Sequence, residues 1–199
     1  MSRTEIFGQI IVFGVLFICV YMYLANRDTL DLKCVVSTVD GNKYCVRDRD
    51  EVNKAVDLLA KTTQKCKKLV EHLFETYPEK DNVLRLYERF NPNQIMETLP
   101  TSEYTAYSEN KGEKLAFCLN KQKKENNNLI DEHTLMFVAT HELAHIATKS
   151  IGHKTEFWQN FKFLLEEAEK IGIHKPVDYK KQNQEYCGMK IRDNPFYDK

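Results

Sequence analysis

Glycine and proline are scarce in this sequence, and neither sign of charge is in excess. The 199 residues contain 7 glycines and 5 prolines, too few for a collagen-like or low-complexity chain. The 29 basic residues are balanced by 29 acidic ones, so no overall positive field favours non-specific binding to nucleic acid. Eleven phenylalanines and ten tyrosines supply the large apolar surface that disordered chains lack. The composition indicates one folded domain with an appendage.

A long apolar run at residues 6–25 holds no charged residue and a single amide, Gln9. As a helix rising about 1.5 Å per residue, this run would span about 30 Å, the thickness of the hydrocarbon core of a bilayer. Tyr21 and Tyr23 lie near its end, where aromatic rings favour the membrane interface. We therefore expect a transmembrane anchor over residues 1–26.

Two other interpretations of the apolar run are a cleaved signal peptide and a buried core helix. A signal peptide usually has a shorter apolar region, of about 7–15 residues, followed by small residues, whereas residues 21–26 read YMYLAN. A surface-packed core helix would carry a polar face, and this run has none. The positive-inside rule gives no orientation, because Arg3 lies on one side and Arg27 and Lys33 lie on the other.

The segment at residues 33–47 reads KCVVSTVDGNKYCVR, two β-branched stretches around an Asp-Gly dipeptide that favours a tight hairpin turn. With this dipeptide as the loop, Cys34 faces Arg47, so a Cys34–Cys45 disulfide requires a different register. An odd number of cysteines lies outside the apolar run, which excludes complete pairing within one chain; they are Cys34, Cys45, Cys66, Cys118 and Cys187. No Asn-X-Ser/Thr acceptor occurs, and the compartment stays open.

Helical periodicity follows the hairpin. Asp48 and Glu51 have the spacing of a capping box, and apolar residues then recur at helical spacing up to Tyr77. This pattern predicts a long amphipathic helix that is ended by Pro78. Cys66 lies on its apolar stripe, which predicts a core residue rather than a reactive thiol.

A shorter helix over residues 82–90 and two strands, at residues 104–108 and 114–119, are predicted next. In the second strand, the alternation of apolar residues with their neighbours predicts one buried face, formed by Leu115, Phe117 and Leu119. The basic cluster at residues 121–124 is interpreted as a solvated turn rather than a ligand site.

The sequence HELAH at residues 141–145 carries the clearest chemistry. Nothing between residues 131 and 150 breaks a helix, so His141 and His145, four residues apart, lie on one helix face and can share a metal. Glu142 follows at about 100° of rotation and can take a proton from metal-bound water. The competing interpretation is a helix with two surface histidines.

A catalytic zinc site needs a third protein ligand and leaves its fourth position to water. We expect Gly152 to end the helix and His153 to close on the metal, with Glu156 as the alternative third ligand. Thr155 is expected to cap a second helix that Gly172 ends. The other histidines are left out: His133 lies two turns before His141, and His72 and His174 are expected to be ordinary surface residues.

Residues 140–161, THELAHIATKSIGHKTEFWQNF, resemble the SprT/WLM group of zinc metallopeptidases, in which HExxH is followed by Gly/Pro-His and an aromatic pair, here Phe157-Trp158. More loosely, the whole pattern is similar to membrane-anchored HELAH proteins of large DNA viruses. The resemblance implies a minimal zincin fold, with Zn²⁺ held by His141, His145 and His153 and with Glu142 as general base.

The same resemblance implies that the strand at residues 114–119 is the edge along which a peptide substrate lies, which makes Ala116, Phe117 and Cys118 candidate substrate-binding residues. A tyrosine near the metal often stabilises the oxyanion in zincins, and Tyr179 and Tyr186 are the candidates. The DNA-directed substrates of DNA-repair members are not carried over, because the chain has no net charge and no basic stripe.

Together these patterns predict an α+β protein: a membrane anchor at residues 1–26, a zincin-like domain at residues 27–175 with a long helix, a small antiparallel sheet and two further helices, and a tail at residues 176–199 packed on the domain.

The expected function is that of a single-pass, membrane-anchored zinc peptidase acting on proteins or peptides. Its membrane is expected to be the internal membrane of a large DNA virus or a host membrane. The alternative is a catalytically silent protein of virion assembly, with virion-membrane or capsid partners. No specific nucleic acid is expected as a partner.

Overall fold

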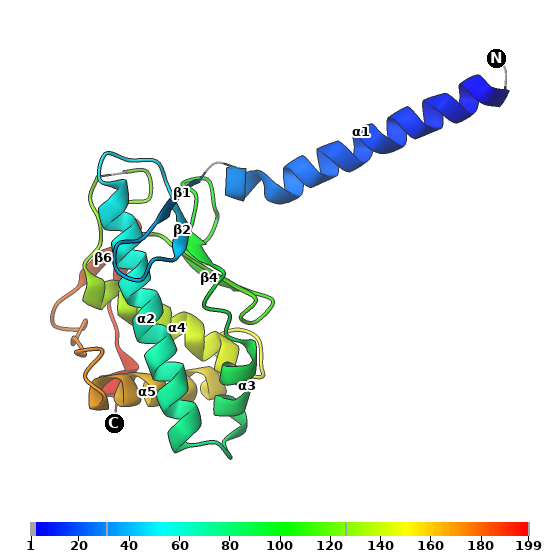
Figure 1. Ribbon diagram of the computed structural model, residues 1–199. Helices are drawn as coiled ribbons and strands as arrows, with labels where there is room; N and C mark the ends of the chain where they lie inside the picture. The colour runs from blue at the N-terminus through cyan, green and yellow to red at the C-terminus, as the bar shows by residue number, and fades with distance from the viewer. Residues whose placement is uncertain (1–2, 31, 126, 199) are drawn as a thin grey trace.

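The computed structural model describes residues 3–30, 32–125 and 127–198, and it has a mixed α+β architecture (Figure 1). Its first element is a 28-residue helix, α1 (Arg3–Leu30). The apolar stretch Phe7–Leu24 of this helix has a mean hydropathy of 2.2, and none of it is buried against the rest of the protein. By length and composition, α1 is therefore a helix that could cross a membrane.

A five-stranded mixed sheet forms the base of the domain, in the order β1-β2-β3-β5-β4. The two outer pairs are antiparallel, whereas β3 pairs in parallel with both β2 and β5. The strands are β1 (Lys33–Val36), β2 (Lys43–Val46), β3 (Ile95–Glu97), β4 (Ala106–Glu109) and β5 (Lys114–Phe117). The expectation of an antiparallel sheet is therefore wrong, because the three-residue strand β3, too short to show a period, inserts between the two hairpins.

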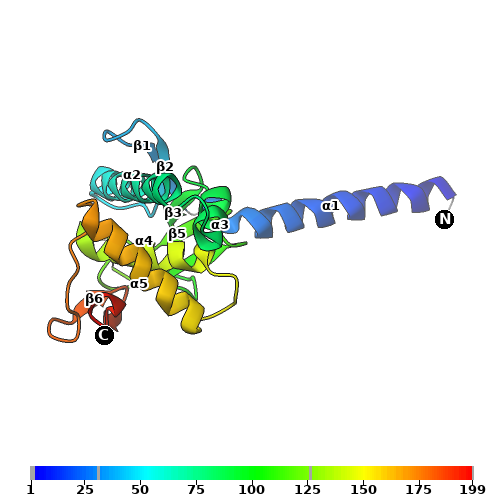
Figure 2. The same ribbon diagram turned by 90° about the horizontal axis from the view of Figure 1, so that it is seen from below.

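Four helices complete the domain, and α2 and α4 contact the sheet while α3 and α5 pack against them (Figures 1 and 2). Their apolar faces meet in one continuous core, in which Leu59, Leu69, Leu135 and Leu143 are fully buried. Helices α2 and α4 lie at the centre of the helical layer, and α4 is buried on nearly every side. The helices are α2 (Val52–Thr76), α3 (Asp81–Arg89), α4 (Glu132–Ala147) and α5 (Thr155–Lys170).

Helix α2 has the predicted length but not the predicted cap. Its N-cap residue is Glu51, with no side-chain capping hydrogen bond, because Asp48 instead pairs with Lys33 at 3.1 Å. The helix ends at Thr76, ahead of Pro78, as the sequence indicates. Cys66 is fully buried with a free thiol, as predicted, and burial raises its pKa to about 12.

The β1–β2 hairpin differs from the prediction in register. Cys34 lies opposite Cys45 and forms a disulfide with it, so the loop is longer than the Asp-Gly dipeptide. Asp57 of α2 explains the difference, because its carboxylate accepts hydrogen bonds from the Ser37 hydroxyl (2.7 Å) and the Thr38 amide (3.0 Å). A contact with a distant helix therefore sets this register.

Strand β5 is not an edge strand, which contradicts the sequence expectation. It lies between β3 and β4, and every side chain from Leu115 to Leu119 is fully buried, including both alternating sets. Cys118 forms a disulfide with Cys187 of the C-terminal tail, so the tail covers a side of the strand that was expected to face solvent. The edge strand of this half of the sheet is β4.

The C-terminal tail forms a separate two-stranded sheet from β6 (Gln184–Tyr186) and β7 (Met189–Ile191), followed by a 3-10 turn, Pro195–Tyr197. That last turn packs against α5. Backbone amides of Cys187 and Gly188 donate to the carbonyl oxygens of Asn120 and Lys121 at 3.0 and 2.8 Å. The tail is therefore joined to the domain at its β6–β7 turn and near its C-terminal end.

Candidate metal centre and adjoining groove

Helix α4 begins one residue after Asp131, whose side chain accepts hydrogen bonds from the amide of Thr134 (2.9 Å) and from its hydroxyl (2.7 Å). This is an N-cap. The helix ends at Ala147, earlier than predicted, and the hydroxyl of Thr148 donates back to the carbonyl oxygen of Ala144 at 2.7 Å. Gly152 is therefore not the helix stop; it lies in the following loop, with a φ of 79°.

Three imidazoles converge beside the C-terminal half of this helix. The Nε2 atoms of His141, His145 and His153 lie 3.1 to 3.2 Å from one another, which is close to the spacing of nitrogen ligands about 2.0–2.1 Å from one tetrahedral ion. Burial, reinforced by the neighbouring imidazoles, lowers the pKa of His141 to about 3. Burial and then His153 lower the pKa of His145 to about 4. Neutral imidazoles are the form that binds metal.

The ring of Phe157 in α5 packs against all three imidazoles. Its ring centroid lies 4.8, 4.4 and 4.6 Å from those of His141, His145 and His153, and its side chain is fully buried. The adjacent Trp158 donates a hydrogen bond from Nε1 to the carbonyl oxygen of His153 at 3.1 Å. The aromatic pair therefore orients the histidines.

The loop that carries His153 is held from two sides. Nζ of Lys111, in the turn between β4 and β5, donates to the carbonyl oxygens of Thr148 (2.7 Å) and Ser150 (2.9 Å). The carboxylate of Glu156 accepts from the amides of Lys149 (2.9 Å) and Ser150 (3.1 Å), and these hydrogen bonds lower its pKa to about 2. The alternative third ligand is thus engaged with the backbone, and the clustered ligand atoms are those of the three histidines.

Glu142 is buried next to the triad, and burial raises the pKa of its carboxyl group to about 8. Its carboxylate has no hydrogen-bond or ion-pair partner in the described part of the chain. It lines the same cavity as His141, His145 and His153. The arrangement can hold a divalent ion and leaves one carboxylate beside it for proton transfer.

A groove of about 800 Å³ runs from the three histidines along the edge strand β4. The segment from Ser102 to Glu109 forms one wall, and Ser150, Ile151 and Gly152 form another. Ala116, Phe117 and Cys118 take no part in it, because they are fully buried in the interior strand. The structure therefore corrects the position of the accessible edge from β5 to β4.

The two candidate tyrosines occupy different places. Tyr179 is buried against Phe137, at a centroid distance of 4.9 Å, and lies outside the two cavities that the histidine triad lines. Tyr186 of β6 lines a second cavity together with His141 and Glu142. Its hydroxyl donates to the carbonyl oxygen of Thr105 at 3.0 Å, and burial followed by the charge of Glu142 raises its pKa. Of the two, the structure brings only Tyr186 near Glu142.

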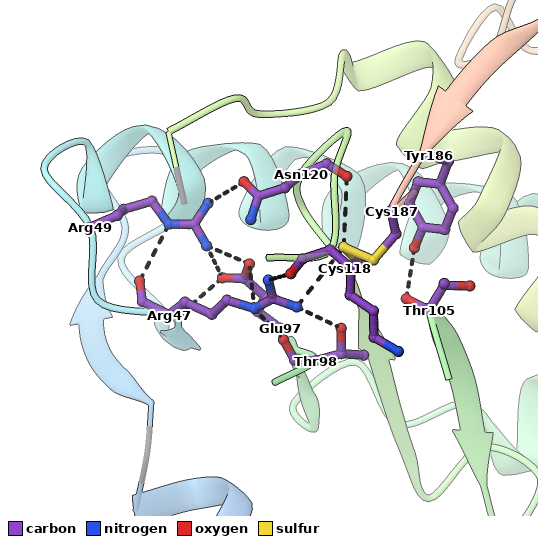
Figure 3. A network of polar contacts seen from close by, with 10 residues as sticks. Arg47, Arg49, Glu97, Thr98, Thr105, Cys118, Asn120, Tyr186 and Cys187 are labelled. Carbon is purple, nitrogen blue, oxygen red and sulfur yellow. Dashed lines mark hydrogen bonds and ion pairs between the residues drawn. A yellow bond between two sulfur atoms is a disulfide. The ribbon is translucent and has the colours of Figure 1, made fainter. Parts of the chain in front are cut away.

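A buried polar network fixes the tail beside the site (Figure 3). Arg49 pairs with Glu97 of β3 and donates from Nη1 to Asn120 Oδ1 at 3.0 Å. Arg47 lies 3.4 Å from the same carboxylate and donates to the carbonyl oxygen of Thr98 at 2.6 Å. The network borders the Cys118–Cys187 disulfide, which directly follows Tyr186 in the tail, so it holds the wall on which this tyrosine lies.

The remaining histidines lie away from the triad. His133 is exposed. His174 is buried, contrary to the surface position expected, and burial lowers its pKa to about 4. His72 is partly buried and pairs with Glu167 at 2.8 Å. Lys111 and the backbone contacts of Glu156 were not predicted from the sequence, because the hydrogen bonds of both side chains with the loop before His153 leave no local sequence pattern.

No family model matches this chain. An uncharacterized protein of Acanthamoeba polyphaga mimivirus is 25% identical over 181 residues, which cover 89% of this chain and 91% of that protein. An uncharacterized protein of Invertebrate iridescent virus 6 is 35% identical over 57 residues, 29% of this chain and 32% of that protein. The crystal structure of Wss1 from Saccharomyces cerevisiae is similar at a TM-score of 0.47 and 16% identity, covering 63% of this chain and 86% of that chain. The chain thus has relatives among viral proteins.

Proposed function

We propose that this protein is a membrane-anchored, zinc-dependent peptidase. The observation that carries the proposal is the convergence of three Nε2 atoms within 3.2 Å at the end of a groove. The unpaired carboxylate of Glu142 faces the same groove. A purely structural histidine cluster does not require such a carboxylate.

The donor set fits zinc. Three imidazoles with one position left open form a known catalytic zinc arrangement, and the lowered pKa values of His141 and His145 keep these rings neutral at pH 7. When bound, the ion supplies Lewis acidity that activates water and polarises the peptide carbonyl. His141 and His145 come from α4, and His153 comes from the loop that Lys111 and Glu156 hold in place.

Residues of the protein carry out substrate alignment, proton transfer and oxyanion stabilisation. The exposed edge of β4 aligns an extended peptide by backbone hydrogen bonds, which places its scissile bond beside Glu142. Burial raises the pKa of Glu142, but the positive charge of a bound ion would favour its ionised form. The carboxylate then takes a proton from the attacking water and delivers it to the amide nitrogen that leaves. Tyr186 lines the second cavity beside His141 and Glu142, and its hydroxyl becomes available to a developing oxyanion once it leaves the Thr105 carbonyl oxygen.

The test compares the full-length protein with Glu142→Gln and His141→Ala, all in lipid nanodiscs and all exposed to the same concentration of zinc. We expect Glu142→Gln to retain one zinc per chain and to lose cleavage of a peptide library by at least about 1,000-fold. His141→Ala should lose both zinc and activity. Undiminished cleavage by Glu142→Gln would contradict the mechanism.

The alternative function is that of a silent virion-assembly protein with the same fold. Occupation of the substrate edge by the tail would favour it, but in the described residues β4 pairs only with β5, and the tail strands pair with each other. Zinc binding without cleavage of any peptide by the parent protein would restore this alternative.

The anchoring half of the proposal rests on α1 and its exposed apolar stretch. We expect the expressed protein to stay with membranes after alkaline carbonate extraction and to retain residues 1–26 by intact mass. Loss of those residues would identify a signal peptide instead. The viral relatives support a virion membrane or a host membrane as its location.

A further inference from the structure

A second cavity, of about 400 Å³, opens on the opposite side of the histidines from the groove along β4. The two cavities share four lining residues: Ala106, His141, Glu142 and His153. The groove continues toward His145 and the C-terminal end of α4, whereas the second cavity continues toward Phe137 and the N-terminal end. An extended chain that lies in the groove and passes Glu142 therefore meets the mouth of the second cavity next.

The walls of the second cavity are mostly apolar, although the tail also contributes the charged residues Arg192 and Asp193, and most of the large apolar side chains come from three elements. Helix α4 contributes Phe137 and Val138, helix α5 contributes Trp158 and Phe161, and strand β7 contributes Met189 and Ile191. Trp158 is 44% exposed and Met189 is 49% exposed, so apolar surface is open to an incoming group. Large apolar and aromatic side chains gain most from such a site, because each buries about 150–250 Å² when enclosed.

One of these walls belongs to the tail, and the tail is fastened where it meets the site. The Cys118–Cys187 disulfide joins it to the residue that follows β5, and the amide of Gly188 donates to the carbonyl oxygen of Lys121 at 2.8 Å. The Tyr186 hydroxyl reaches the carbonyl oxygen of Thr105, immediately before β4 (Figure 3). Met189 and Ile191 lie two residues apart on β7, so both face the cavity while Lys190 between them points away.

We propose that this cavity is a specificity pocket that receives a large apolar side chain of the substrate, at a position adjoining the cleaved bond. The disulfide-fastened strand β7 forms one wall of this pocket. The inference rests on the proposed peptidase function and adds the substrate class to it: extended peptides with Phe, Leu, Met or Trp next to the scissile bond. We infer a substrate side chain as the occupant because the pocket is continuous with the groove through His141, Glu142 and His153.

The first experiment measures cleavage by the full-length, zinc-loaded protein in nanodiscs. Digestion of a proteome-derived peptide library should show large apolar residues enriched at one position beside the cleaved bond. Ile191→Phe places a larger side chain in the pocket. It should reduce kcat/KM for peptides with Phe or Leu at that position by at least about tenfold, whereas kcat/KM for peptides with Ala there should change less than about twofold. Lys190→Phe, on the opposite face of the same strand, should retain the parent selectivity. The proposal is overturned if the parent cleaves peptides equally well whatever residue stands at that position, or if Ile191→Phe has the same selectivity as the parent.

A second measurement does not depend on catalysis. Trp158 is the single tryptophan of the chain and lines the pocket, so its fluorescence reports occupancy directly. In Glu142→Gln, titration with short blocked peptides that differ at one residue should shift the emission to the blue, with Phe and Leu peptides binding at least about tenfold more tightly than the Gly peptide. Ile191→Phe should abolish this difference and Lys190→Phe should not. A response to added lipid vesicles and not to peptides overturns the pocket assignment. Apolar selectivity in binding without any cleavage by the parent retains the pocket and refutes the peptidase.

Discussion

Nζ of Lys111 donates a 2.7 Å hydrogen bond to the carbonyl oxygen of Thr148, the residue that caps the C-terminal end of α4. The same ammonium group reaches the carbonyl oxygens of the next two residues at 3.3 and 2.9 Å. Lys111 and Asn110 adopt left-handed conformations, with φ values of 56° and 46°, in a turn where a Cβ on Gly112 would lie 2.5 Å from the carbonyl oxygen of Arg89. A strained turn of the sheet thus holds the loop that presents His153.

Lys111→Met is expected to weaken zinc binding by roughly tenfold, because the loop bearing the third ligand loses one of its two supports. The measurement is competition for zinc against a chromophoric chelator. Lys114→Met is the matched control, since Lys114 lies on the same hairpin but pairs with Glu109 and stays away from the loop. Equal zinc affinity in parent and Lys111→Met would show that the loop is held without this contact.

Glu156→Gln decides between the two candidate third ligands. Because the Glu156 carboxylate accepts backbone amides rather than joining the ligand cluster, the variant should still bind one zinc per chain, with an affinity lowered by at most about tenfold. His153→Ala should lose far more, since it removes a ligand. Zinc content would be measured by elemental analysis. The reverse order of effects would make the carboxylate the ligand.

Local patterns in the sequence were sufficient for part of the fold and site. The 3.6-residue period located α2 and the buried thiol of Cys66, and the i, i+4 spacing placed His141 and His145 on one face. The convergence of His153 with them agrees with the loop expected after the helix. These features depend on contacts within about one helix and its next turn, which a sequence displays directly.

The features that the sequence did not indicate depend on contacts between distant segments. Strand β3 has three residues and owes its position to β2 and β5, and the burial of both faces of β5 depends on the tail. The register of Cys34 depends on Asp57 of α2. The local sequence pattern of β5 is the same whether one face is exposed or a disulfide-bonded tail covers that face as well, so the burial of both faces could not be predicted.

Removal of the Cys118–Cys187 disulfide by paired Ser substitutions is expected to free the tail. The cross-link has a sequence separation of 69 residues, for which loop entropy predicts a loss of about 4 kcal/mol in stability. Limited proteolysis should then cut near residues 188–193, with cleavage sites read by mass spectrometry. Paired Ser substitutions at Cys34 and Cys45, separated by 11 residues, are the control: about 3 kcal/mol is lost and the tail stays protected. Equal protection of the tail in both variants would show that β6 and β7 are held without the cross-link.

Glu167 of α5 should make stability depend on acidity. Burial alone would raise its pKa, but hydrogen bonds from His72, Tyr77 and Lys170 prevail and lower it; the first two distances are both 2.8 Å. A carboxyl group whose pKa is lower in the folded state stabilises the fold above its unfolded value of 4.5, and this contribution disappears as the pH falls through the lowered folded value.

Glu167→Gln should therefore lower stability by about 1–3 kcal/mol at pH 7, and the difference from the parent should shrink as the pH is taken below about 4. The measurement is thermal unfolding of the metal-free, full-length protein, followed by Trp158 emission between pH 3 and pH 7. Glu166→Gln, at the exposed neighbouring position, should follow the parent at every pH. If the difference in stability between Glu167→Gln and the parent stays constant across this range, the charge of the carboxylate does not stabilise the contact between α5 and α2, and packing alone does.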